Sequence, residues 1–335
     1  ASDVYKRQIL VCVTILQALM NPIASLVLIR MNGGTAMMRI LGIVGVQICI
    51  CVPIIVFQFC KGKEFFSKEY WGYALRIGIP IVPHYLSGII LNQGDRIMID
   101  KMVGKTEVAL YGLAYSIGML VQLFISGMNS ALTPWMYSKI KKGDIRSMRK
   151  VLQLLSIVVV GIAVALMLIS PELVLIFGSP KYREAVYVIP PVAASVFFIF
   201  IYNILSMPQF YYEKTQFLMA ASMAAAGANV VLNFIFIRLF GYIAAGYTTL
   251  ACYMLYSVGH YIVSKRILVN EGIQENLMSP GFLVACSVFL IGASIICNLI
   301  FPYRILRYAI LLASAGLVFW KKELLQKTMA DIRKK

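Results

Sequence analysis

The chain has 335 residues, of which 60% are hydrophobic and only 13% are charged, and its mean hydropathy is +0.82. Soluble domains contain about twice that share of charged residues, so the composition excludes an ordinary soluble protein. The net charge of +17 would suggest nucleic-acid binding in a soluble protein. Lysines and arginines also collect in the cytoplasmic loops of membrane proteins, however, so we expect no nucleic-acid partner.

The first eight residues, 1–8, are polar and stop abruptly at an apolar run. They resemble translated sequencing-adapter sequence, and we expect them to be non-native. On that expectation the chain is an N-terminally truncated fragment.

Ten apolar runs follow, each long enough, at about 20 residues, to cross a bilayer as a helix. They are Ile9–Ile29, Ile40–Cys60, Ile77–Asp100, Val108–Tyr137, Val151–Ser170, Ala185–Pro208, Phe217–Phe240, Tyr242–Val263, Gly281–Ile300 and Tyr303–Trp320. The sequence therefore predicts an all-α polytopic membrane protein. One alternating set of connections, including 61–76, 139–150 and 321–335, holds most of the lysines and arginines. The positive-inside rule assigns that set, and the C-terminus, to the cytoplasm.

The third run carries ionisable and amide side chains. Read as a helix, it has His84, Gly88, Asn92, Asp95, Arg96 and Asp100 on one face, following steps of three and four. Charged side chains at membrane depth usually face a bundle interior or a water-filled cavity, so this run predicts a cavity-lining helix. The spacing also predicts an ion pair between Arg96 and Asp100.

Two interpretations stay open for these residues. Asp95 and Arg96 can contact a charged substrate or a coupling ion. They can also be structural, because at about 1.5 Å per residue Asp95 lies roughly 27 Å from Ile77, near the outer face of the membrane. His84 can relay a proton, or can be a neutral hydrogen-bonded group inside the bundle.

Further polar residues lie in other runs. Asn229 and Asn233 are four apart, and we expect them to hydrogen-bond between helices first and to line a cavity second. Tyr115 can stack on a sugar ring or anchor a helix end at the interface. The basic run Lys139–Asp144 fits a cytoplasmic loop, and can also attract the diphosphate head of a lipid.

The seven cysteines lie within or at the edges of apolar runs, and none forms a C-x-x-C pair with partner histidines. With only two histidines in the chain, the sequence predicts no metal site, no disulfide framework and no cofactor.

Three stretches carry a family resemblance. The first stretch comprises Ile77–Pro80, Asn92–Arg96, Val103-Gly104 and Leu110–Tyr115. The second is Ile176–Ala185. The third comprises Asn229, Leu232-Asn233 and Gly241–Gly246. In order and spacing they resemble the Wzx-like oligosaccharide flippases of the multidrug/oligosaccharidyl-lipid/polysaccharide exporter superfamily. They are similar to that family's helix seven with the start of eight, its turn between nine and ten, and its helix eleven–twelve hairpin.

The resemblance implies a fourteen-helix, two-lobed MATE-like fold, of which this chain holds about ten helices. The chain is accordingly predicted to begin with a non-native segment (1–8), followed by the last two helices of the first lobe (9–60) and a cytoplasmic inter-lobe linker (61–76). The second six-helix lobe (77–263) comes next. A cytoplasmic loop with the final helix pair (264–320) and a basic cytoplasmic tail (321–335) complete the prediction.

The resemblance also implies a function that is not enzymatic. Such a protein, in the bacterial plasma membrane, flips undecaprenyl-diphosphate-linked oligosaccharides by alternating access for surface polysaccharide biosynthesis. Arg96 is the expected contact for the anionic head group, and H⁺ or Na⁺ is the candidate coupling ion. The expected partners are the lipid-linked oligosaccharide, membrane lipids and other polysaccharide-assembly proteins.

Other functions stay open. Within the same superfamily they are a peptidoglycan-precursor flippase and a drug/cation antiporter. A membrane glycan polymerase or ligase would be an enzyme. Two observations argue against a polymerase or ligase. The longest outer connection, around Pro171–Glu184, is small, and the sequence has no Ser/His/Asp set or paired-carboxylate site of useful spacing.

Overall fold

The computed structural model describes residues 2–31, 36–62 and 66–320, and within these ranges the chain is helical, without strands. The helices are α1 (Ser2–Met31), α2 (Ala36–Gly62), α3 (Lys68–Met102), α4 (Lys105–Gly118), α5 (Val121–Lys141), α6 (Ile145–Phe177), the 3₁₀ helix η1 (Pro180–Val188), α7 (Ile189–Tyr211), α8 (Thr215–Phe240), α9 (Ala244–Asn270), α10 (Pro280–Ile300) and α11 (Arg304–Trp320). The predicted all-α fold class is confirmed. The basic tail 321–335 lies outside the described residues.

The chain divides into two compact units, residues 1–75 and 76–335. In the first unit α1 and α2 form a helix pair with one close approach. A Cβ on Gly42 of α2 would lie 2.6 Å from the Cα of Ser25 in α1. The Ser25 hydroxyl also donates to the carbonyls of Asn21 (2.7 Å) and Arg39 (3.3 Å). The missing glycine side chain therefore lets the two backbones pack closely, as small residues do between spanning helices.

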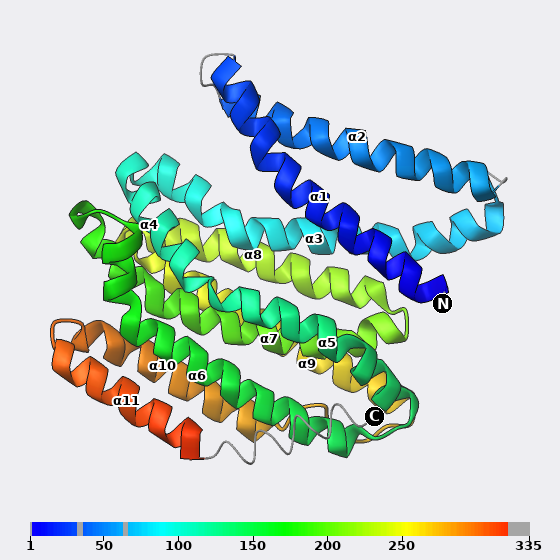
Figure 1. Cartoon of the computed structure of the whole chain (residues 1–335). Coiled ribbons are helices and arrows are strands. Elements are labelled where there is room, and N and C mark those ends of the chain that lie inside the picture. Colours follow the sequence, from blue (N-terminus) through cyan, green and yellow to red (C-terminus); the bar gives the residue numbers. More distant parts are fainter. Residues whose placement is uncertain (1, 32–35, 63–65, 321–335) are drawn as a thin grey trace. The chain divides into compact units, whose positions relative to one another are not determined.

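In the second unit α7 forms the core. Residues 189–201 are all buried, with no polar side chain except Ser195. A helix that is apolar all round is buried on every face, and α7 packs most extensively against α9 and α6, with α5 and α10 as further neighbours. Figure 1 shows α7 between α8 and α6.

The predicted run Val108–Tyr137 is two helices in the structure, α4 and α5, bent by 42° at their junction. The backbone N–H groups of Met119 and Leu120 bond back to Tyr115 and Ile117 and close the last turn of α4. Gly118 lies against α7 there, because a Cβ on it would be 2.6 Å from Cγ1 of Val192. The sequence did not reveal this bend, since it depends on a contact with a helix more than 70 residues away.

Two other boundaries differ from the prediction. The run Ala185–Pro208 starts as the 3₁₀ helix η1 and becomes α7 at Ile189, where Pro190 and Pro191 occupy the first turn. Proline is favoured in a first turn because its missing N–H is not needed there. The predicted linker 61–76 is mostly helical: α2 continues to Gly62, α3 begins at Lys68, and α3 runs on through Pro80 and Pro83.

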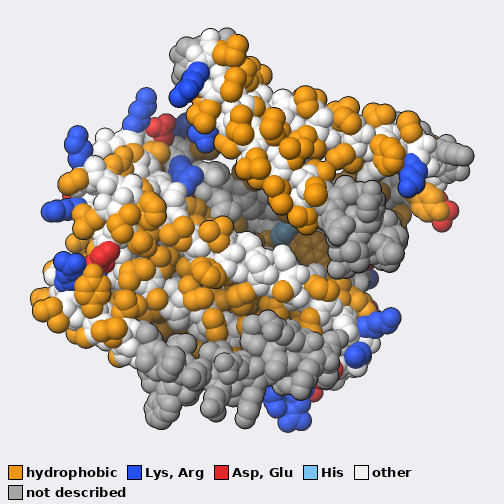
Figure 2. Space-filling model, viewed as in Figure 1, with side chains coloured by type: hydrophobic (Ala, Val, Ile, Leu, Met, Phe, Trp, Pro, Cys, Tyr) orange, Lys and Arg blue, Asp and Glu red, His pale blue; other side chains and the backbone are white. Residues whose placement is uncertain are grey.

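Seven of the described helices are long and apolar enough to cross a membrane, or eight if the bent α4–α5 pair is one span. This is fewer than the ten spans predicted. Neither α11, with 17 residues, nor α9, which carries buried threonine, tyrosine and histidine side chains, is among them. Figure 2 shows hydrophobic side chains over most of the visible surface, with lysines and arginines toward the helix ends. The protein is a multi-pass membrane protein.

A buried ion pair fixes α11 to α6. Arg307 is 3% exposed, and its two terminal nitrogens donate to the two carboxylate oxygens of Glu172 at 2.9 Å each. Arg307 also donates to the Leu168 carbonyl (2.7 Å), and Tyr308 donates to Glu172.

The close packing at Gly118 gives a stability prediction. Gly118→Ala is expected to destabilise the fold by about 1–3 kcal/mol, because the new methyl group overlaps Val192. Gly127→Ala is the matched control, since Gly127 lies inside α5 with no atom within 4 Å of an added Cβ. Alanine favours a helix over glycine, so this control is expected to be neutral or stabilising. Thermal unfolding in detergent measures both, and equal midpoints for the two variants would contradict the packing argument.

Candidate functional site

The polar residues of α3 lie on and beside its buried face. The buried residues of this helix are Ser87, Leu91, Asp95 and Ile99, each four residues after the one before. That spacing places them in one row along the helix. Asn92 and Arg96 follow Leu91 and Asp95 by one residue and are half-buried at the edge of the row.

Asp95 is the centre of the site. Its side chain is fully buried, and its carboxylate accepts hydrogen bonds from three helices. Tyr111 of α4 donates at 2.5 Å and Thr249 of α9 at 2.6 Å, both to Oδ2, while Asn233 of α8 donates from Nδ2 to Oδ1 at 2.5 Å. Hydrogen bonds to a charged group are stronger than neutral ones, so these contacts offset part of the cost of burying the carboxylate.

A second ring of polar atoms surrounds Asp95. Thr248 donates its hydroxyl to Oδ1 of Asn233, and Asn233 donates to Oδ1 of Asn229 at 3.2 Å. Asn229 and Asn233 are fully buried, and Nδ2 of Asn229 has no hydrogen-bond partner among the described residues. We call Asp95, Tyr111, Asn229, Asn233, Thr248 and Thr249 the Asp95 cluster. It concentrates carboxylate, amide and hydroxyl oxygens inside an apolar bundle.

Asn92 joins the cluster to a row of tyrosines. Its Oδ1 accepts from the hydroxyls of Tyr115 (2.6 Å) and Tyr253 (3.3 Å), and its Nδ2 donates to the Gly88 carbonyl (2.7 Å). Tyr115 is buried, so the predicted role as an interfacial anchor does not describe its position. Its hydroxyl donates a hydrogen bond to Asn92 of α3.

Arg96 is the cation of the site, but its predicted partner is wrong. In the described part of the chain no ion pair joins Arg96 to Asp100, which is exposed. Instead Nη1 of Arg96 donates to Gln93 (2.7 Å), and the guanidinium lies 5.1 Å from the centre of the Tyr115 ring. The buried Nε has no hydrogen-bond partner among the described residues. The helix is rotated so that Asp95 faces inward, which leaves Arg96 at its edge and Asp100 outside.

His84 lies in a separate aromatic group nearer the start of α3. Its Nδ1 is 3.0 Å from the hydroxyl of Tyr256 on α9. Tyr256 in turn contacts Tyr202 of α7 and His260 of α9, with ring centres 4.4 and 4.5 Å apart. His260 is fully buried and its Nδ1 is 2.8 Å from Nε2 of Gln209. His84 is thus hydrogen-bonded inside the bundle.

The sequence analysis missed the residues that α9 contributes. Thr249, Tyr253, Tyr256 and His260 recur at steps of four, three and four and line one face of this helix, with Thr248 beside Thr249. That periodicity was visible in the sequence as a polar stripe along an apolar run. Threonine and tyrosine are ordinary residues in spanning helices, however, and the stripe became informative only once it lay opposite Asp95, Asn92 and His84.

One lysine of the basic run at the end of α5 forms an ion pair within the protein. Lys139 is buried and its Nζ lies 2.5 Å from Asp144, which caps α6 by accepting from the backbone N–H of Ser147. Lys141 and Lys142 are exposed. Only these two lysines of the run are free to attract an anionic lipid.

The chemistry of the Asp95 cluster suits a proton or a monovalent cation. Carboxylate, amide and hydroxyl oxygens are hard ligands, whereas the described residues contain no group of three or more His, Cys, Asp and Glu side chains that would hold a metal ion. A buried carboxylate also changes charge when it takes up a proton, which changes the hydrogen bonds that it accepts.

Two family models match the chain in overlapping ranges. The model described as "Polysaccharide biosynthesis protein" matches residues 4–141, and the model described as "MatE" matches residues 80–235. They overlap on α3–α5, and the second range also includes Asn229 and Asn233 of α8. Neither range alone covers half of the chain, but together they span residues 4–235 and support the resemblance to the Wzx-like flippases of the multidrug/oligosaccharidyl-lipid/polysaccharide exporter superfamily.

Two relatives of this chain from Haemophilus influenzae are similar over about half of its length. "Lsg locus putative protein 1" is 28% identical over 172 residues, which is 48% of this chain and 41% of that protein. An "uncharacterized membrane protein" is 29% identical over 167 residues, or 47% of this chain and 40% of that protein. The matched region thus spans about two fifths of the length of each curated relative. No solved structure shows a significant match.

The hydrogen bonds of Asp95 give a second stability prediction. Asp95→Ala is expected to destabilise the protein by on the order of 3 kcal/mol, because Tyr111, Asn233 and Thr249 lose their acceptor while they stay buried. Asp100→Ala is the matched control, since this carboxylate is exposed on the same helix. Thermal unfolding in detergent compares the two variants. If Asp95→Ala unfolds at the same midpoint as Asp100→Ala, the cluster does not hold the helices together.

Proposed function

We propose that this protein flips a lipid-linked oligosaccharide across the bacterial plasma membrane for surface polysaccharide biosynthesis, and that the Asp95 cluster couples this movement to H⁺ or Na⁺. The observation that carries the coupling is the fully buried carboxylate, which gathers donors from α4, α8 and α9. Such residues inside a membrane bundle mark ion and proton pathways. The match to a polysaccharide biosynthesis family supports the substrate class.

The coupling follows from the charge of Asp95. As a carboxylate it accepts three hydrogen bonds. When it is protonated it becomes a donor, and when it binds a cation its oxygens are shared with that cation. In both cases its contacts with Tyr111, Asn233 and Thr249 are redistributed. Because the three donors lie on three helices, the arrangement of α3 relative to α4, α8 and α9 then depends on the bound ion.

Arg96 is proposed as the contact for the anionic head group. Its guanidinium stacks beside Tyr115 and is hydrogen-bonded only to neutral Gln93, so its charge is not neutralised by a carboxylate. Guanidinium groups bind phosphate oxygens in a bidentate way. The proposal places the end of α5, with Lys141 and Lys142, on the cytoplasmic side, together with the C-terminus.

The role of Arg96 is tested by complementation with the full gene in a strain that lacks its own copy. Arg96→Ala is expected to lower surface polysaccharide about tenfold at equal protein level, as one lost charge-assisted contact allows. Lys101→Ala, an exposed cation on the same helix, is the control and should leave the polysaccharide unchanged. Undiminished polysaccharide with Arg96→Ala would remove this residue from the mechanism.

The coupling ion is tested in proteoliposomes with a fluorescent lipid-linked oligosaccharide. Flipping by the parent protein is measured with a Na⁺ gradient at uniform pH and, separately, with a pH gradient in the absence of Na⁺. One of the two gradients is expected to accelerate flipping, and the gradient that does so identifies the coupling ion. Asp95→Asn keeps the shape of the side chain but cannot carry the charge, so its flipping rate should be the same with and without the gradient. A variant that still responds to the gradient would contradict coupling at Asp95.

The same preparation separates the proposal from its rivals. Growth of polymer from lipid-linked units by the purified protein would show a polymerase instead of a flippase. Drug resistance conferred by the gene, unaffected by loss of glycan-assembly genes, would indicate a drug/cation antiporter. Flipping of a peptidoglycan precursor in preference to other lipid-linked glycans would assign the other flippase class.

A further inference from the structure

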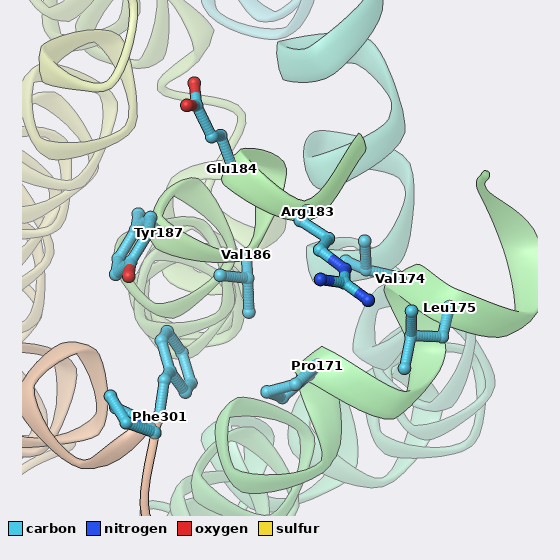
Figure 3. A pocket seen from close by; sticks show the side chains of 9 residues that line it. Pro171, Val174, Leu175, Arg183, Glu184, Val186, Tyr187 and Phe301 are labelled. Carbon is cyan, nitrogen blue, oxygen red and sulfur yellow. The ribbon is translucent and has the colours of Figure 1, made fainter. Parts of the chain in front are cut away.

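A pocket of about 580 Å³ lies where α6 ends, beside η1 and the turn between α10 and α11. Pro171 and Leu175 of α6, Arg183 of η1 and Phe301 of the turn are among its lining residues. Figure 3 shows the Arg183 guanidinium extending across the pocket toward Val174 and Leu175. The pocket thus combines apolar walls with one cationic group, and its volume is within the range of about 300–1,000 Å³ that is typical of ligand sites.

The pocket lies at the level of the lipid head groups. The last cationic residue near the start of α6 is Lys150, and a hydrocarbon core of about 30 Å takes roughly 20 residues of helix. Counting from Val151, the core ends near Pro171, which is the first residue of the pocket. Beyond it Leu175, Ile176 and Phe177 are 55%, 72% and 62% exposed, as expected for side chains that contact lipid.

The charge of Arg183 is not neutralised within the protein. Among the described residues no hydrogen bond or ion pair involves its guanidinium. Glu172, the nearby acidic residue of α6, is occupied by Arg307 and Tyr308.

Glu184 also lines the pocket, but its carboxylate points away from Arg183 in Figure 3. It acts instead on Tyr242 in the α8–α9 connection. Burial, together with the charges of Glu184 and Glu107, raises the pKa of Tyr242 to about 12. Lys181 and Arg304, both exposed, add positive charge at the same end of the helices.

We infer that this pocket binds the head group of an anionic phospholipid. Arg183 contacts the phosphate, and the acyl chains leave the pocket past Pro171 toward the hydrocarbon core. The two features that select this ligand are an unneutralised guanidinium and an apolar exit toward the hydrocarbon core, because basic groups at this level attract anionic lipids. The inference does not depend on the proposed transport function.

Native mass spectrometry of the detergent-purified full chain tests the inference with phosphatidylglycerol and phosphatidylcholine of the same acyl chains. The parent protein is expected to retain phosphatidylglycerol preferentially. Arg183→Ala should reduce that retention about fivefold, which corresponds to about 1 kcal/mol for one basic residue near an anionic lipid. Arg183→Lys keeps the charge and should retain most of the preference.

Arg238→Ala is the matched control. Arg238 is an exposed arginine at the end of α8, on the same side of the bundle, and lies over the Phe234 ring outside the pocket. It should leave lipid retention unchanged. Unchanged retention with Arg183→Ala, or equal losses with both variants, would overturn the inference in favour of a general surface charge.

The apolar wall is tested separately. Leu175→Ser removes lipid contact at an exposed position and should weaken retention of phosphatidylglycerol without lowering the unfolding midpoint. Soluble glycerol phosphate, which lacks acyl chains, should not displace the lipid at equal concentration. Displacement by glycerol phosphate would mean that the pocket binds free phosphate, and it would overturn the lipid assignment.

Discussion

The structure of the second unit depends on the burial of one carboxylate. Asp95 is fully enclosed in a membrane-spanning bundle, where an unpartnered charge is costly by several kcal/mol. The cost is offset by donors from α4, α8 and α9. None of the extensive helix–helix contacts within the described residues involves α3, so side-chain hydrogen bonds at His84, Asn92 and Asp95 attach this helix to the bundle.

This mode of attachment distinguishes α3 from α7. The core helix α7 is held mainly by close apolar packing of residues 189–201, which include no titratable side chain. The position of α3, by contrast, depends on groups whose donor and acceptor roles change with protonation. A transporter needs a rigid part and a part that responds to its coupling ion. The two kinds of packing supply these parts within one unit, which is why we assign coupling to α3.

The sequence was sufficient for the fold class, for the approximate position of each helix and for the polar character of α3. It also identified Asn229 and Asn233 as hydrogen-bonding residues, although not their partner. It could not supply Tyr111 and Thr249, because contacts between helices far apart in sequence leave no local pattern. The prediction of an ion pair between Arg96 and Asp100 was wrong for a related reason. Spacing of four makes the pair feasible, but the rotation of α3, fixed by the buried Asp95, decides which charges face each other.

The charged residues of the bundle show how position, not residue type, determines their role. Arg307 is buried and ion-paired with Glu172, so it holds α11 against α6. Arg183 lines the pocket at the end of α6 without a partner among the described residues, where the proposed lipid phosphate would neutralise it. Arg96 lies between these cases, half-buried and bonded only to neutral groups. A guanidinium left without a counter-charge inside the membrane is stable only if it reaches water or an anion. In the proposed mechanism that anion is the head group of the substrate.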